Sequence, residues 1–135
     1  MVMFAAALQP VRAQEIDPGE IALARQPALP FAAGVSAYDR GEFAVAREIW
    51  LPWAHRGDPA AQRNLAHIYR MGLGVAQDFK QAAAWYRRAA DAGLSRAQAN
   101  LAAMYLRGQG VGEDAKQAAY WFTVAAANGH ALAQY

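Results

Sequence analysis

Residues 61–93 read AQRNLAHIYRMGLGVAQDFKQAAAWYRRAADAG, and residues 97–129 read AQANLAAMYLRGQGVGEDAKQAAYWFTVAAANG. The two stretches align without a gap at an offset of 36 residues, and they share their alanine–glutamine start, their loop glycines and an aromatic pair. A fixed period of this length is typical of repeat architectures, in which each unit buries its apolar face against its neighbours. The chain is therefore predicted to be an array of short, similar units.

Each unit has the apolar periodicity of two helices. Ala61, Leu65 and Ile68 recur at spacings of three and four residues, as do Trp85 and Ala89 further along, and this spacing places such residues on one side of a helix. Alanine at these positions lets helix backbones approach closely, and the aromatic rings fill the space that remains. We therefore expect a helix of about 12 residues, a glycine-containing loop and an antiparallel helix of about 13 residues.

The predicted helix ends have recognisable signals. Asp58 stands before Pro59, which predicts a capping carboxylate followed by a proline in the first helical position. Gly57, Gly93 and Gly129 stand where the second helices are expected to end, and a left-handed glycine commonly ends a helix. Capping boxes are predicted at three further helix starts: Ser95 with Gln98, Asp78 with Gln81, and Asp114 with Gln117.

A degenerate copy of the unit precedes the two full ones. Trp50 falls at the position of Tyr86, and Tyr38 fits the position of Tyr69 when five residues are deleted from the loop. The predicted organisation is a probable partial signal peptide (1–13), an irregular lead-in (14–30), a degenerate helix-pair repeat (31–57), two full repeats (58–93 and 94–129) and the start of a further, truncated repeat (130–135).

The period, the loop glycines and the aromatic pair together resemble one known family, the Sel1-like repeat, a relative of the tetratricopeptide repeat. Its pattern is A-x-x-x-L-G/A-x-x-Y-x-x-G-x-G-V-x-x-D followed by A-x-x-W-Y/F-x-x-A-A-x-x-G, and it is found from Ala61 to Gly93 and again from Ala97 to Gly129. The resemblance implies an all-α fold, a right-handed α-solenoid of antiparallel helix pairs. It also implies a protein-binding adaptor or regulator, and in bacteria many such proteins look exported.

Composition excludes several classes of protein. The 135 residues include no cysteine, which excludes disulfide scaffolds, thiolate zinc sites and thiol catalysis. It also sets aside the cysteine-rich branch of the family that has been linked to β-lactam binding. The net charge is only +2 and the arginines are scattered, so no nucleic-acid partner is indicated. No apolar run approaches the roughly 18 residues that a membrane span needs.

The first residues resemble the second half of a secretory signal. Met1 to Leu8 form a short apolar run, and Val11 and Ala13 are small residues where a signal peptidase would cut. No basic segment precedes the run. The prediction is a periplasmic or secreted protein; the alternatives are a frayed N-terminal helix and a cytoplasmic protein.

No catalytic, metal or cofactor site is predicted. The Gly72–Val75 loop lacks the preceding strand of a dinucleotide site, so its glycines are expected to serve a tight turn. His55, His67 and His130 lack metal-ligand spacing, and a single histidine on a surface helix is usually solvated. The recurring Asp78 and Asp114, listed above as caps, stand at helix starts rather than in an acid–base pair. The four tryptophans have helical spacing and are expected in the core: Trp50, Trp53, Trp85 and Trp121.

The best candidates for binding a partner are Asn64 and Asn100, which recur on the first helix of each unit. In tetratricopeptide-like solenoids that helix lines the concave face, and an amide can both donate to and accept from the backbone of an extended peptide. The alternative is that each asparagine bonds the backbone of the neighbouring repeat. Five basic residues could make the groove suit an acidic or C-terminal-carboxylate partner, or they could form a solvated helix face: Arg63, His67, Arg70, Arg96 and Arg107.

The predicted function is a non-catalytic interaction module. Two other classes stay open, a cell-wall-associated hydrolase by family analogy and a self-assembling structural subunit. The second depends on the C-terminal end, where we expect the face around Trp121, Phe122 and Val124 to lack a covering neighbour. Such an edge suggests either a continuing chain or self-association.

Overall fold

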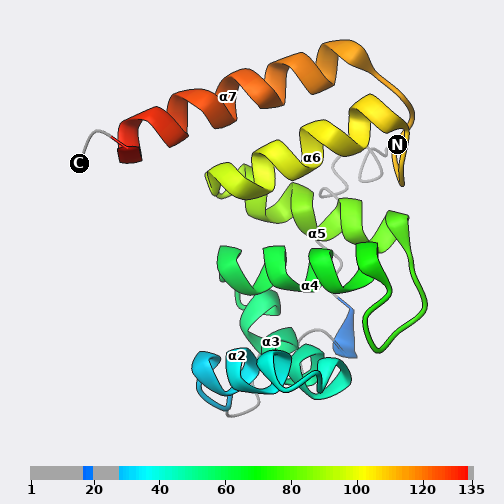
Figure 1. Ribbon diagram of the computed structural model, residues 1–135, viewed down its shortest axis with the longest axis vertical. Coiled ribbons are helices and arrows are strands. Elements are labelled where there is room, and N and C mark those ends of the chain that lie inside the picture. The colour runs from blue at the N-terminus through cyan, green and yellow to red at the C-terminus, as the bar shows by residue number, and fades with distance from the viewer. Residues whose placement is uncertain (1–16, 20–27, 134–135) are drawn as a thin grey trace, which may run out of the picture.

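The structure is a computed structural model that describes residues 17–19 and 28–133. The segment predicted as a signal peptide and most of the lead-in lie outside these ranges. The described part of the chain is helical (Figure 1), with these elements: α2 (Phe31–Asp39), α3 (Phe43–His55), α4 (Pro59–Met71), α5 (Phe79–Asp91), α6 (Ser95–Arg107) and α7 (Ala115–Ala133).

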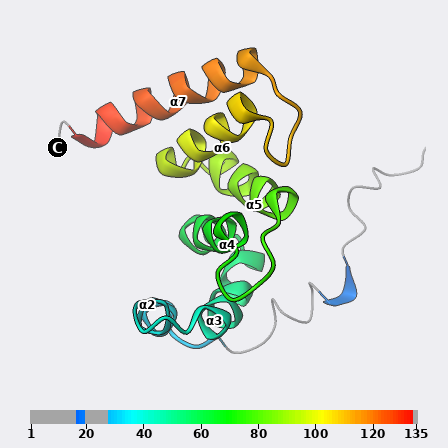
Figure 2. The same ribbon diagram turned by 45° about the vertical axis from the view of Figure 1, so that its right-hand side comes forward.

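The helices form hairpins that stack in chain order. Each hairpin pairs two consecutive helices, α2 with α3, α4 with α5 and α6 with α7, and neighbouring hairpins meet through α3 against α4 and α5 against α6. Figure 2 shows that the stack of helices curves. The predicted all-α solenoid is therefore confirmed.

The core of the stack consists of alanines and large rings. Ala46, Ala61 and Ala82 are completely buried, and Tyr86 is among the largest side chains that are fully buried. The tryptophans are largely in the core as predicted, because Trp50, Trp85 and Trp121 are buried. Trp53 is only half-buried, and its indole N–H donates to the carbonyl oxygen of Leu29 at 2.9 Å.

The aspartate caps form, but the serine cap does not. Asp58 accepts a hydrogen bond from the amide of Ala61 at 2.9 Å, and Asp78 accepts one from Gln81 at 3.1 Å. Asp114 accepts from the amides of Lys116 and Gln117. The capping box predicted at Ser95 is wrong, because Ser95 is already the first helical residue and the cap position belongs to Leu94, with no side-chain bond. Leu94 packs against the apolar core, which sets the helix start one residue earlier.

The glycines that follow the second helices behave in two ways. Gly57 and Gly93 have positive φ angles of 97° and 95°, as predicted. The prediction for Gly129 is wrong, since α7 continues through it and its φ is not positive. In the described chain no helix packs beyond α7, so nothing stabilises a turn there, and residues 130–133 continue α7 instead of beginning a new helix.

The loop glycines serve the turn, as expected. Gly72 and Gly74 have φ angles of 68° and 66°. A side chain on Gly110, the counterpart of Gly74, would overlap the carbonyl oxygen of Phe79. These glycines let each loop fold down onto the preceding unit, which is a structural role.

The edge at α7 is only partly open. Phe122 is 42% exposed and the neighbouring Tyr120 is 58% exposed. Val124 is half-buried. Trp121, which was expected beside these residues on the uncovered face, is instead buried in the core, as the helical spacing of the tryptophans predicts.

Candidate peptide-binding groove

A hollow of about 370 Å³ lies between α2 and α4, the first helices of adjacent hairpins. Val35 and Tyr38 come from α2, Trp50 forms part of the lining from α3, and three polar side chains come from α4: Arg63, Asn64 and His67. We refer to these six residues as the α2–α4 hollow. Three of the residues predicted to bind a partner therefore lie in one site.

Helical geometry explains the lining. Arg63 and His67 are four residues apart on α4, and Val35 and Tyr38 are three apart on α2, so each pair lies on one side of its helix. Gly34 lets α2 approach Trp50, since a Cβ at residue 34 would overlap the indole.

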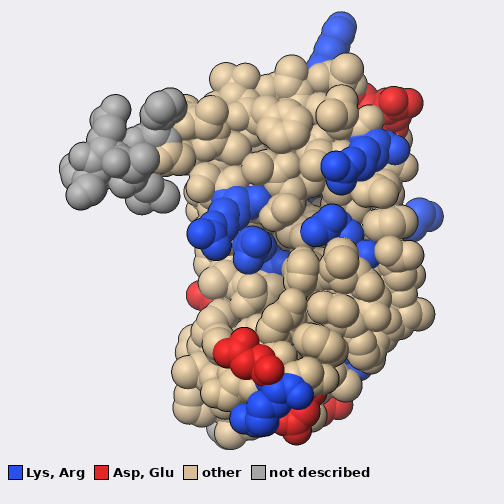
Figure 3. All heavy atoms as spheres, viewed as in Figure 1, with Lys and Arg blue, Asp and Glu red and all other residues tan. Residues whose placement is uncertain are grey.

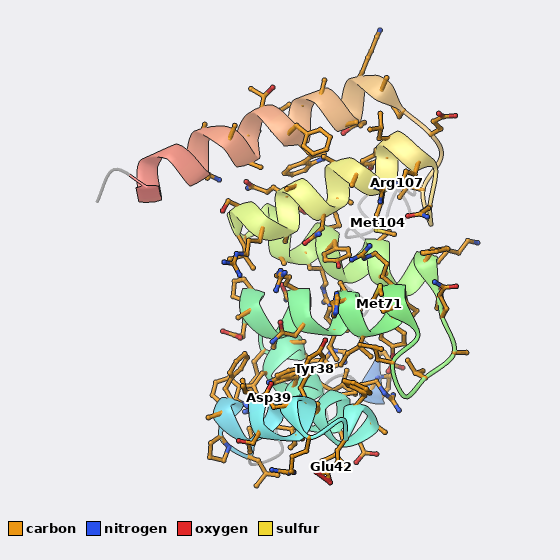
Figure 4. All side chains as sticks on the ribbon, in the orientation of Figure 1. Tyr38, Asp39, Glu42, Met71, Met104 and Arg107 are labelled. Atoms are coloured by element: carbon orange, nitrogen blue, oxygen red, sulfur yellow. The ribbon has the colours of Figure 1, made fainter. Side chains whose placement is uncertain are left out.

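His67 links the two sides of the hollow. Its Nε2 lies 3.2 Å from the Tyr38 hydroxyl, and Figure 4 places Tyr38 between α2 and α4. Burial lowers the pKa of His67, and the nearby charges of Arg70 and Arg63 lower it further. The imidazole is therefore predominantly neutral near pH 7, and this histidine is not simply solvated as the sequence suggested.

Arg63 and Asn64 have unused hydrogen-bonding capacity. The Nε of Arg63 is buried without a hydrogen-bond partner, and so is the Oδ1 of Asn100 on α6. Within the described residues, neither Asn64 nor Asn100 bonds the backbone of a neighbouring repeat, which was the alternative prediction for both. A buried polar atom without a partner in the free protein indicates a position where a ligand or water would complete the bond.

The remaining predicted residues lie outside the hollow. Arg70 lies on α4 about one turn after His67, and its Nε donates to the Tyr86 hydroxyl at 3.3 Å. Arg96 and Arg107 are exposed near the two ends of α6, and Figure 4 labels Arg107 at one of them. The seven candidates therefore do not converge on one point but extend over α4 and α6, the first helices of successive repeats.

The charges of this groove lack partners. Within the described part of the chain, Arg63, Arg96 and Arg107 form no ion pair, whereas Arg87 pairs with Asp91 elsewhere. Figure 3 shows Lys and Arg side chains gathered across the middle of the same face, with most acidic side chains near its ends. The groove thus presents positive charge that the described chain does not neutralise.

The sequence does not predict the apolar part of the hollow. Its repeat pattern predicts Tyr38 only as a repeat position and Trp50 only as a core residue, and it makes no prediction for Val35. The available signal was the repeat alignment, which places Tyr38 and Trp50 in the unit that precedes α4.

Metal-binding clusters and membrane-spanning helices were also sought among the described residues. Within residues 17–19 and 28–133, no three His, Asp or Glu side chains gather as a metal site would require. None of the described helices is both long and apolar enough to cross a membrane.

A curved stack of antiparallel helix pairs defines a helical-repeat solenoid. The family model for the Sel1 repeat matches residues 59–94 and 95–130. The chain therefore belongs to the Sel1 repeat family, whose members typically act as protein–protein interaction modules.

Two solved structures are similar to this chain. The Sel1 repeat protein from Oxalobacter formigenes is 31% identical with a TM-score of 0.71, and the match covers 77% of this chain and 43% of that one. A protective antigen of uropathogenic Escherichia coli, which displays the SLR fold, is 33% identical with a TM-score of 0.69, covering 73% of this chain and 22% of that one. The chain thus spans less than half the length of either protein. No curated protein matches it.

Proposed function

We propose that this chain is a non-catalytic adaptor or regulator that holds an extended, acidic segment of a protein partner in the groove along α2, α4 and α6. The observation that carries this proposal is the set of groove arginines without ion pairs, Arg63, Arg96 and Arg107. Unpaired cations on one face attract a partner of opposite charge and suppress partners of like charge. The family membership supports protein binding in general.

Affinity capture from envelope and cytosolic fractions of the source cell tests the proposal. The groove variant Arg63→Gln/Arg107→Gln removes two charges from the concave side. The matched control Lys80→Gln/Lys116→Gln removes two charges from the starts of the second helices α5 and α7. A partner captured by the parent and the control but lost by the groove variant supports the proposal. A partner kept by all three baits contradicts the groove as the binding surface.

Export is part of the same proposal, supported by the apolar run from Met1 to Leu8 and the small residues near Ala13. The test is the mass of a C-terminally tagged chain recovered from the envelope. Loss of the first 13 residues or so supports export, and recovery of the intact chain only from the cytosol contradicts it.

A second candidate function is self-assembly, which the exposed Tyr120 and Phe122 favour. Apolar rings of this size are typical of association surfaces. Light scattering over a wide concentration range distinguishes the two functions. A mass that rises with concentration, and does not rise in the Phe122→Ser variant, favours the structural subunit; a constant mass contradicts it.

A further inference from the structure

The α2–α4 hollow has the dimensions of a small binding site. Its volume of about 370 Å³ lies near the lower end of the range for ligand pockets. It therefore suits one amino-acid residue of a partner rather than a whole helix.

The lining of the hollow has two chemically different parts. Val35, Trp50 and the ring of Tyr38 supply apolar surface, and Arg63, Asn64 and His67 supply polar groups. None of the six is acidic. A guanidinium can only donate hydrogen bonds and an asparagine amide donates from its nitrogen, so the complementary ligand has a negatively charged acceptor beside an apolar group.

Both polar groups are free to bind such an acceptor. Arg63 forms no ion pair with a described residue and its buried Nε has no partner. The side chain of Asn64 forms no hydrogen bond with a described residue. Binding a carboxylate would therefore complete hydrogen bonds that the free protein lacks, without breaking existing ones.

We propose that the α2–α4 hollow binds the C-terminal residue of a partner peptide, with the terminal carboxylate on Arg63 and Asn64 and an apolar last side chain against Val35 and Trp50. This inference rests on the proposed function, because it names the chemistry of the segment that the groove holds. An aspartate or glutamate side chain also offers a carboxylate, but it brings no apolar group to the Trp50 side of the hollow.

The equivalent part of α6 and a second hollow in the described chain lack this combination. The repeat offset places Ala99 and Ala103 of α6 where α4 has Arg63 and His67. A second hollow of about 270 Å³ includes Lys80 and Arg87. There Arg87 already pairs with Asp91, donates to the Tyr105 hydroxyl and lies over the Trp121 ring.

The test uses N-acetyl-leucine, which carries the carboxylate and side chain of a C-terminal leucine. Titration into the ¹⁵N-labelled full chain is followed by NMR at the Arg63 Nε–H, the Asn64 side-chain amide and the Trp50 indole N–H. We expect saturable shifts at all three groups, with a dissociation constant in the millimolar range that is usual for so small a ligand. No saturable shift at these groups would overturn the proposal.

Two analogues identify the chemistry that is recognised. N-acetyl-leucinamide lacks the charge and should bind at least tenfold more weakly. Glutamate α-amide, acetylated at its nitrogen, carries only a side-chain carboxylate and should also bind at least tenfold more weakly. Equal binding of either analogue overturns the assignment to a C-terminal residue.

Variants locate the site. Arg63→Gln should abolish saturation and Arg63→Lys should weaken it, because lysine keeps the charge but not the two-pronged geometry. Lys116→Gln removes a charge at the start of α7, away from the hollow, and should leave the affinity unchanged. Unfolding curves and the backbone NMR spectrum show whether each variant is folded. If Lys116→Gln weakens binding as much as Arg63→Gln, the ligand responds to general charge and the proposal fails.

These outcomes are independent of the proposed function. A partner captured through the groove arginines, together with no binding of N-acetyl-leucine, would keep the groove as the interaction surface and overturn only the C-terminal pocket. Binding of N-acetyl-leucine without any captured partner would keep the C-terminal pocket and leave the proposed function of the groove without support.

Discussion

Residues 86 and 122 occupy the same position in successive repeats, yet their rings have opposite environments. Tyr86 on α5 is 1% exposed, whereas Phe122 on α7 is 42% exposed. The helix α5 packs against α4 on one side and α6 on the other, while α7 packs chiefly on α6, with Arg87 of α5 over its Trp121 ring. At this repeat position the burial of the ring therefore depends on whether a neighbouring hairpin follows.

The first helices of the two full repeats differ in the residues that face the groove. Arg63 and His67 on α4 become Ala99 and Ala103 on α6, although the helix ends and the packing positions around them are the same in both repeats. The positions that recur form the packing contacts between helices. The positions that change, such as Arg63 and His67, give the first full repeat a surface that the second does not share. Asn64 and Asn100 recur, so recurrence alone does not separate the two roles.

The largest difference in stability between the two repeats is expected when the ring at this position is removed from each in turn. Tyr86→Ala should cost about 3–5 kcal/mol of unfolding free energy, because it empties a fully enclosed site and removes the acceptor for Arg70. Phe122→Ala should cost less than about 1 kcal/mol, because much of that ring is already in water. Urea denaturation of both variants measures the difference. Equal losses would mean that α7 is covered in solution, as self-association would produce.

A smaller effect is expected at the buried glutamines that link consecutive hairpins. Gln62 donates to the carbonyl oxygen of Ala54 and Gln98 to that of Ala90, at 3.0 and 3.1 Å. Only Gln98 also accepts a bond, from Asn128 at 2.8 Å, while the Oε1 of Gln62 has no partner.

Gln98→Leu should therefore cost about 2 kcal/mol, since it removes two hydrogen bonds. Gln62→Leu should cost about 1 kcal/mol or less, because it also removes an unsatisfied atom. Thermal and urea unfolding compare the two variants. A larger loss at Gln62 would contradict the assignment of the second bond to the later repeat.

The helix starts of the two repeats should differ by about 1 kcal/mol. Asp58→Ala removes a capping bond to the Ala61 amide, whereas Ser95→Ala removes a hydroxyl that caps nothing. The first variant should lose about 1 kcal/mol and the second only a few tenths. Equal losses in urea unfolding would mean that Ser95 caps α6, as the sequence predicted.

Much of this fold could be predicted because its signals are local and repeated. The 36-residue offset, the aspartate caps and the loop glycines each follow from sequence alone. Gly129 could not be predicted in the same way, since a helix end there depends on a neighbouring helix that the described chain does not contain. Trp121 shows the reverse, because α6 and Arg87 of α5 are enough to bury it without a following helix in the described chain.

The candidate site was predictable only in part. Asn64, Arg63 and His67 could be assigned to one groove because they share a helix. The hollow also needs Tyr38 and Trp50, which come from a unit with a shortened loop. Their contribution depends on how α2 sits against α4, which is a matter of three-dimensional packing and not of spacing along the chain.

The smallest expected effect is a pH dependence that only the first repeat has, because α6 carries Ala103 where α4 carries His67. The pKa of His67 in the folded chain lies below its ordinary value of 6.5, owing to burial and to Arg70 and Arg63. The unfolded chain therefore binds the proton more readily, and folding stability rises with pH. This contribution is fully present above about pH 6.5 and is lost as the pH falls toward the lower, folded-state pKa.

The variant His67→Gln separates this contribution from those of the other histidines. At pH 8 the variant should be slightly less stable than the parent if glutamine does not replace the contact of His67 with Tyr38. Between pH 7 and pH 5 the parent should lose more stability than the variant, so that the two unfolding free energies converge. Parallel curves over this range would mean that His67 titrates in the folded chain as it does when unfolded, and that the charges of Arg63 and Arg70 are screened by solvent at the hollow.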